Sequence, residues 1–186
     1  TSGVSELRVK GLDDSNTLIS GKIDLAGGET ASKEFAKNGD VATYELRSEW
    51  MQGRAVNVRN HLWDLALTTR VPLNLTIEAG VGRSTLDLRD VQLSGLEVST
   101  GVGATTINLA TGGYKANIST GVGATTIRLP TGVAARVELE RGLGAVNVRG
   151  DFDKNEDVYT SPDYATAEER IDLQVQGGVG AITIQS

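Results

Sequence analysis

Hydrophobic and polar residues alternate with period two along much of the chain, and this pattern recurs about every 20 residues. Such alternation is typical of β-strands that bury one face. In each repeat the alternation slips by one residue at a Gly-Val/Leu-Gly tripeptide. The tripeptides begin at Gly80, Gly101, Gly121, Gly142 and Gly178, with successive spacings of 21, 20, 21 and 36 residues.

The repeats predict a stacked, all-β fold. Two of them are nearly identical: residues 99–109 read STGVGATTINL and residues 119–129 read STGVGATTIRL. A repeat this short cannot bury its own apolar face, whereas a stack of repeats can. We therefore expect a right-handed parallel β-solenoid of about five rungs over residues 72–186. The right-handed winding follows from the crossover rule for parallel strands.

Each tripeptide is expected to form a corner at which the strand turns. Glycine suits such a corner because it tolerates positive φ and lets neighbouring backbones approach closely. The predicted corner glycines are Gly80, Gly82, Gly101, Gly103, Gly121, Gly123, Gly142, Gly144, Gly178 and Gly180. The residue between each pair continues the inward phase of the preceding strand, so these aliphatic residues are expected in the interior. They are Val81, Val102, Val122, Leu143 and Val179.

The pattern is interrupted twice. A polar insertion, residues 151–169, occupies part of the 36-residue interval, after which residues 171–186 return to the pattern and are expected to close the stack. Residues 1–71 alternate less regularly, and we interpret them as an irregular N-terminal β cap, since end rungs of such stacks are usually atypical.

Composition excludes several classes of function. The 186 residues include 24 acidic and 18 basic ones, a formal charge of −6 that argues against a nucleic-acid binder. The chain has no cysteine and one histidine, which excludes disulfides, thiol catalysis and multi-histidine metal sites. No apolar run approaches the ~18 residues of a membrane helix. The glycine corners lack the Gly-Lys-Ser/Thr of a phosphate loop, so no cofactor is expected.

One acidic segment resembles a calcium loop, because oxygen-bearing side chains occupy alternate positions. These are Asp151, Asp153, Asn155 and Asp157. However, Glu156 stands where a calcium loop has its turn glycine, and Pro162 stands at the closing glutamate position. A solvated acidic loop is therefore the favoured interpretation, with a calcium site as the alternative.

Catalytic chemistry finds little support in the sequence. His61 has no recognisable nucleophile partner, so a structural histidine is favoured. A carbohydrate-active enzyme needs paired carboxylates on one face. The predicted register instead stacks Asp87 and Asn108 with two further residues, Arg128 and Asn147, which we interpret as a surface ladder. No catalytic residue is assigned.

Two further features have structural and functional interpretations. Trp50 and Trp63 are able to form a recognition platform, but we favour burial under the N-terminal cap. Arg141 falls in the inward column of Thr100 and Thr120, where a buried arginine requires a carboxylate partner. Because Arg141 adjoins a corner, we expect its side chain to reach solvent.

The segment from Trp63 to Gly82, WDLALTTRVPLNLTIEAGVG, resembles the toastrack/LiaF-like envelope-response family, and the later GVGATTINL and GVGAITI copies strengthen the resemblance. It covers roughly residues 60–186. The resemblance implies a non-enzymatic protein without catalytic residues. It also implies an association with membrane helices and two-component stress signalling, in which LiaF-like proteins restrain a membrane histidine kinase.

Together these observations predict a non-catalytic interaction module of the bacterial cell envelope, linked to sensing or regulating envelope stress. Its expected partner is a protein, such as a membrane sensor kinase or another envelope regulator. The alternative is an adhesin-like or self-assembling surface scaffold that binds glycan, and the remote alternative is a carbohydrate-active enzyme. We expect an extracytoplasmic location, secreted or attached through a segment outside this chain.

Overall fold

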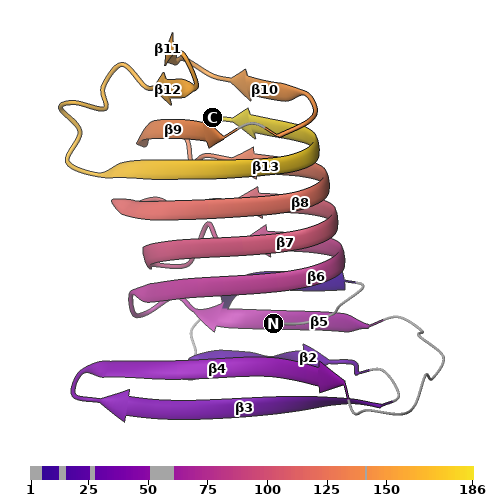
Figure 1. The fold of residues 1–186 in the computed structure, drawn as a ribbon. Coiled ribbons are helices and arrows are strands. Elements are labelled where there is room, and N and C mark those ends of the chain that lie inside the picture. Colours follow the sequence, from indigo (N-terminus) through magenta and orange to yellow (C-terminus); the bar gives the residue numbers. More distant parts are fainter. Residues whose placement is uncertain (1–5, 13–15, 26–27, 51–60, 141) are drawn as a thin grey trace.

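The computed structural model describes residues 6–12, 16–25, 28–50, 61–140 and 142–186. Every regular element in these residues is a β-strand (Figure 1). Eleven strands form one large, mostly parallel sheet, and the other two form a separate hairpin. The all-β prediction is therefore confirmed.

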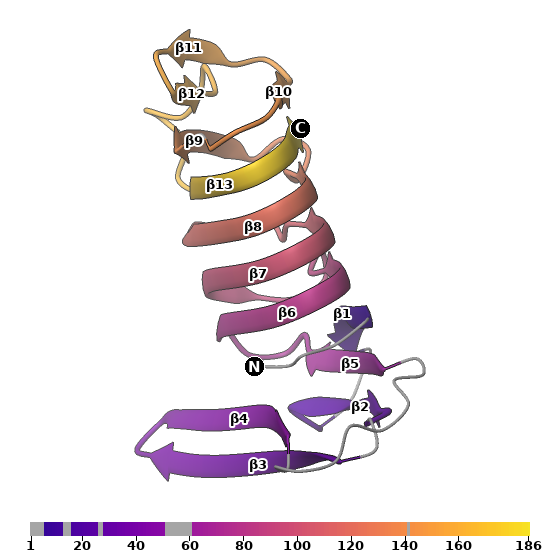
Figure 2. The same cartoon turned by 45° about the vertical axis from the view of Figure 1, so that its right-hand side comes forward.

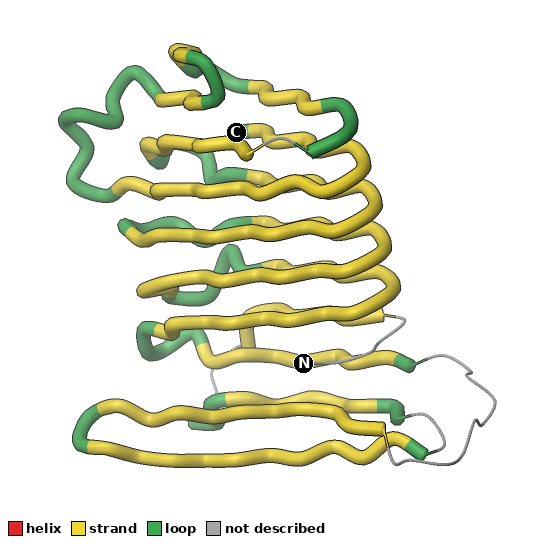
Figure 3. The backbone as a smooth tube through the Cα atoms, viewed as in Figure 1, coloured by secondary structure: helices red, strands yellow, loops and turns green. Residues whose placement is uncertain are grey.

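Three long strands form the centre of the stack: β6 (Leu73–Asp87), β7 (Leu93–Asn108) and β8 (Tyr114–Arg128). Each bends around a glycine corner and so contributes to two layers of the molecule (Figures 1 and 2). Loops join successive strands on the side opposite the corners (Figure 3). The strands pair in parallel with their tripeptides in register, so that one repeat of about 20 residues advances the chain by one rung.

The last repeat does not close the stack, contrary to the sequence prediction. Strand β13 (Arg170–Gln185) lies between β8 and the preceding repeat, which consists of β9 (Ala134–Glu140) and β10 (Val146–Arg149). The repeat at 134–149 is thus the terminal rung. Its outer edge pairs antiparallel with β12 (Val158–Thr160), which pairs with β11 (Asp153–Asn155). Because an open sheet edge invites aggregation, this order places the insertion where an edge needs cover.

The N-terminal strands extend the same sheet. β1 (Glu6–Leu12) lies between the post-corner half of β6 and β5 (Leu62–Thr68), and β2 (Ile19–Ile23) pairs antiparallel with β5. The hairpin of β3 (Glu29–Asn38) and β4 (Val41–Trp50) forms the separate two-stranded sheet. The sheet therefore runs without a break across the predicted boundary at residue 71.

The core consists of aliphatic columns that run along the stack. Before the corner, the observed register matches the predicted one: Leu75, Leu96, Ala116, Leu173 and Val137 are aligned. After the corner, the apolar alternation predicts that Val146 and Ile182 align with Leu86. The structure instead places Val148 and Ile184 in that column, so the last two repeats are shifted by two residues. The observed column is Leu86, Ile107, Ile127, Ile184 and Val148. Each of these side chains lies five residues after its tripeptide's central residue, so spacing from the corner sets the register.

This shift changes the predicted outward ladder. Asn147 pairs with Thr183 and does not belong to the column of Asp87. That column instead contains Asp87, Asn108, Arg128, Gln185 and Arg149.

Candidate interaction surface

The corners are built from glycines whose backbones stack directly on one another. The second glycine of each tripeptide has a positive φ, for example +145° at Gly103. A Cβ atom placed on Gly103 would lie 1.7 Å from the carbonyl oxygen of Gly82 in the rung below. Only glycine fits this close approach, and its backbone conformation re-sets which side chains point inward.

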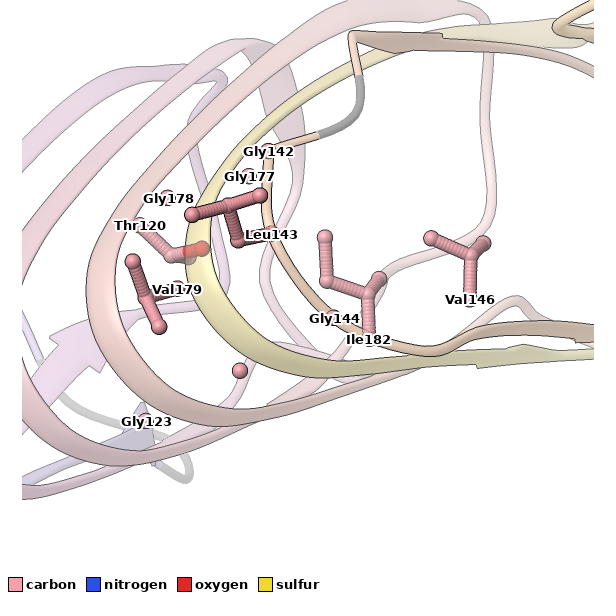
Figure 4. Close-up of a pocket in the computed structure, with 11 residues that line it drawn as sticks. Thr120, Gly123, Gly142, Leu143, Gly144, Val146, Gly177, Gly178, Val179 and Ile182 are labelled. Carbon is pink, nitrogen blue, oxygen red and sulfur yellow. The ribbon is translucent and has the colours of Figure 1, made fainter.

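The aliphatic residue between the two glycines points outward, and the prediction that it lies in the interior is wrong. These five side chains are between 49% and 75% exposed: Val81, Val102, Val122, Val179 and Leu143. Figure 4 shows Val179 and Leu143 on the outer side of the corner, whereas Ile182 and Val146 point into the interior. In the second rung, Thr100 and Thr105 lie inside the corner, and the Thr105 hydroxyl donates to Thr100 Oγ1 at 3.3 Å. In the rung of β13 the equivalent positions hold Gly177 and the larger Ile182.

A second apolar column runs beside the first one. Two residues after each central aliphatic residue stands an exposed alanine, except in the first rung, where Arg83 takes its place. We call the two columns together the corner strip. It consists of Val81, Val102, Val122, Val179, Leu143, Ala104, Ala124, Ala181 and Ala145. With neighbouring strands about 4.8 Å apart, the five rungs give the strip a length of about 24 Å.

Polar columns border the corner strip on both sides. The column before the corner contains Glu78, Ser99, Ser119, Gln176 and Glu140. On the other side, the adjacent column contains Thr85, Thr106, Thr126, Thr183 and Asn147. One column further from the strip, Asp87 accepts two hydrogen bonds from Arg89, both of 2.7 Å. This guanidinium holds the pKa of Asp87 below its ordinary value. The charge of Asp87 is thus already paired with that of Arg89. In the same column, Arg128 donates a hydrogen bond to Asn108 Oδ1 at 3.1 Å.

The hollows on the described surface do not suggest a substrate pocket. The one at the terminal corner has a volume of about 10 Å³, enough for about one water molecule (Figure 4). A wider, open groove of about 520 Å³ is lined by Arg89, Arg128, Pro130 and their neighbours. Arg89 and Arg128 in this groove form the hydrogen bonds to Asp87 and Asn108 that are described above.

The structure does not gather the candidate calcium ligands. Asp153 and Asn155 lie at the two ends of β11, and Asp151 is exposed before it. Within the described ranges, no three His, Cys, Asp or Glu side chains form a group able to hold a metal ion. The calcium site therefore stays a prediction without structural support.

Trp63 lies in β5, and His61 directly precedes this strand. Trp63 is 3% exposed, which confirms its predicted burial. His61 is also buried, and its Nδ1 lies 3.7 Å from a carboxylate oxygen of Glu29, linking the start of β5 to the start of β3. The Trp50 side chain and Arg141 lie outside the described residues.

Residues 1–128 match the family model for the N-terminal domain of toast_rack, DUF2154. The chain belongs to the toast_rack family. A crystal structure of a candidate cell adhesion protein from Clostridium sporogenes ATCC 15579 is similar to this toast_rack chain, with 25% sequence identity and a TM-score of 0.89. The match covers 98% of this chain and 88% of the other. No curated protein is found to match.

The family match spans both the N-terminal strands and the first rungs of the toast_rack chain. Among the residues that the structure describes, there is no helix long and apolar enough to cross a membrane.

Proposed function

We propose that this toast_rack chain is a non-catalytic interaction module of the bacterial cell envelope, and that it binds its partner through the corner strip. The observation that carries the proposal is the continuous row of exposed aliphatic side chains along the corners. Singly exposed hydrophobic residues are normal on protein surfaces, whereas contiguous apolar patches mark interaction sites. The centres of protein interfaces are also poor in charged residues, as is the strip.

Rigidity supports the same proposal. We interpret the stack as a right-handed parallel β-solenoid, in which in-register backbone pairing fixes every residue of the strip. A preorganised surface loses little conformational entropy on binding, so a modest apolar area still yields useful affinity.

Two kinds of partner fit this module. Membership of the toast_rack family, together with the LiaF-like resemblance, supports a membrane regulator and a role in sensing or regulating envelope stress. The similarity to a candidate cell adhesion protein favours the second candidate, an adhesin-like surface scaffold. A carbohydrate-active enzyme has less support. The two carboxylates of the column beside the strip, Glu78 and Glu140, lie four rungs apart, about 19 Å, and Asp87 is already bound by Arg89.

An affinity capture tests the proposal. The purified chain is immobilised and exposed to solubilised membranes and to purified cell wall of the source organism, with and without prior treatment of the cells by a cell-wall-active antibiotic. The variant V102K/V122K charges the strip, and the control S94K/N117K places the same charges on exposed sites of the same strands that lie further from the corner and outside the column that borders the strip.

Recovery of a membrane regulator that changes with the antibiotic, is lost with V102K/V122K and is kept with S94K/N117K supports envelope-stress regulation. Recovery of cell-wall glycan or of the chain itself, with the same dependence on the strip, supports the scaffold. Equal recovery by both variants would show that the strip is not the binding surface.

A further inference from the structure

We propose that the outward column of Asp87 and Arg128 is a second binding surface, and that it holds a linear acidic glycan whose sugars carry carboxylate groups. We call it the basic column. It consists of Lys10, Asp87, Asn108, Arg128, Gln185 and Arg149. The threonine column separates it from the corner strip, so this inference goes beyond the proposed function and does not depend on it.

Charge is distributed unevenly between the two halves of the rungs. The strand halves after the corner carry three basic residues and one acidic residue: Arg83, Arg128, Arg149 and Asp87. The strand halves before the corner carry five acidic and three basic residues: Glu78, Glu97, Glu138, Glu140, Asp172, Lys115, Arg136 and Arg170. Since the whole chain has a formal charge of −6, the half after the corner is a local exception that attracts anions.

Two arginines of the basic column keep an unbalanced charge. The neighbours of Arg128 and Arg149 in the column are the uncharged Asn108 and Gln185, and the column's one carboxylate, Asp87, is already paired. The hydrogen bond from Arg128 Nη1 to Asn108 Oδ1, at 3.1 Å, orients the guanidinium but uses only one of its five N–H donors. Both arginine side chains are exposed, so a ligand is able to reach the other donors.

The open groove of about 520 Å³ lies along the basic column. Arg128 and Asn108 line it together with Thr111, Thr131 and Pro130. The two threonines come from the loops that follow β7 and β8, on the side opposite the corners (Figure 3). Because the groove passes from one rung to the next, an extended chain that lies in it crosses the strands and follows the column.

The spacing of the arginines favours a chain over a single anion. Arg128 and Arg149 lie two rungs apart, about 9.6 Å along the column, with Gln185 between them. Their like charges repel each other, so a single small anion would engage one of them and leave the other unused. On β1, Lys10 extends the same line beside Asp87. A linear ligand with charges at intervals is able to engage the whole column.

The kinds of side chain favour a carboxylated glycan. A guanidinium binds both oxygens of a carboxylate with its planar fork. Between the charges, the amides of Asn108 and Gln185 and the hydroxyls of Thr111 and Thr131 both donate and accept hydrogen bonds, as sugar hydroxyls require. A flat anionic membrane would instead match charges spread over an area, whereas the adjacent threonine column is uncharged. A chain of acidic sugars presents its carboxylates and hydroxyls in one line.

Fluorescence anisotropy with a labelled oligogalacturonate, a chain in which each sugar carries one carboxylate, tests the proposal. R128Q and R149Q should each weaken binding about fivefold, which corresponds to about 1 kcal/mol for one exposed ion pair. Since the two positions are about 9.6 Å apart, their effects should add, and R128Q/R149Q should weaken binding about 25-fold. R136Q is the matched control, because it removes the same charge from an exposed position before the corner, and it should bind like the unmodified chain.

Three results would overturn the proposal. Equal binding of neutral dextran would show that the charges do not select the ligand, and equal binding by R128Q/R149Q would place the site elsewhere. Tighter binding of polyphosphate or of phosphatidylglycerol vesicles, lost in R128Q/R149Q, would assign the column to a different anion. The proposed function is tested separately, because R128Q/R149Q should still capture the partner of the corner strip. Failure of either surface therefore leaves the result for the other one standing.

Discussion

The substitution Gly103→Ala tests how the corners are built. The added Cβ would lie 1.7 Å from the Gly82 carbonyl oxygen, whereas ordinary van der Waals contact begins at 3.4 Å. The rungs must therefore separate by about 1.7 Å at this point, which breaks backbone hydrogen bonds whose ordinary length is about 2.9 Å. Losing two such bonds costs about 2 kcal/mol. Holding alanine at a φ of +145° costs a further 1–3 kcal/mol or so.

We therefore expect Gly103→Ala to lower the free energy of unfolding by about 3–5 kcal/mol, a large part of the 5–15 kcal/mol or so of a typical domain. Guanidinium chloride unfolding followed by tryptophan fluorescence measures it. Gly112→Ala is the matched control, because Gly112 has a φ of +119° but no atom within 4 Å of its added Cβ. The control should lose only the strain, about 1–3 kcal/mol. Equal destabilisation of the two variants would refute the close stacking of the corners.

Three further predictions concern the core and its surroundings. Ile127→Asp should unfold the stack, because Ile127 is fully buried and the new charge has no partner. Asn108→Asp sets a second carboxylate opposite Asp87 on a partly exposed surface and should cost only about 0.2–1 kcal/mol; circular dichroism melting distinguishes the two variants. Asp87→Asn should cost about 0.5 kcal/mol at pH 7, little because the ion pair is partly exposed. Since the folded pKa of Asp87 is lowered, its contribution is present above the unfolded value of about 3.9 and disappears as the pH falls through the folded value. Urea unfolding of both forms at pH 7 and at low pH should show the difference vanish. Tyr164→Phe removes a hydrogen bond to Asp172 and should speed proteolysis within residues 161–169 without changing the core.

Much of the fold could be predicted because its signals are local. The period-two alternation and the repeated tripeptide predicted strands and the alignment of the columns before the corners. The alternation of inward and outward residues slips by one position at each tripeptide, but the pattern alone does not show whether the slip comes before or after the central residue. Placing it after the central residue predicts that Val122 and its equivalents lie in the interior. The observed answer depends on the second glycine of each corner, whose positive φ turns the preceding aliphatic side chain outward and re-sets the inward phase after it.

The order of the rungs could not be predicted, because all repeats carry the same inward pattern and any two are able to pair in parallel. In the structure, β13 lies between β8 and β9, so the order of the rungs differs from the order of the repeats in the sequence. The register of the last two repeats, by contrast, was available from the sequence. Val148 and Ile184 lie five residues after Leu143 and Val179, as Ile127 does after Val122. Aligning the repeats by their pairs of apolar residues, and not by their distance from the tripeptide, places Val146 and Ile182 in this column instead.

The candidate surface was also only partly predictable. The five aliphatic residues were identified as a set, but their exposure, which makes them a binding candidate, follows from the turn at the glycines. The sequence does not predict the alanine column, because alanine is equally compatible with the interior and the surface.

Hydroxyl-radical footprinting tests the central claim most directly, because it reports the solvent exposure of individual side chains in the free and bound protein. In the free chain, Val102, Val122, Val179 and Leu143 should be oxidised readily. On binding to envelope material, or at high surface density, these side chains should become protected, while Phe35 and Tyr44 of the β3–β4 hairpin keep their reactivity. Protection of the hairpin with unchanged oxidation of the strip would contradict the account.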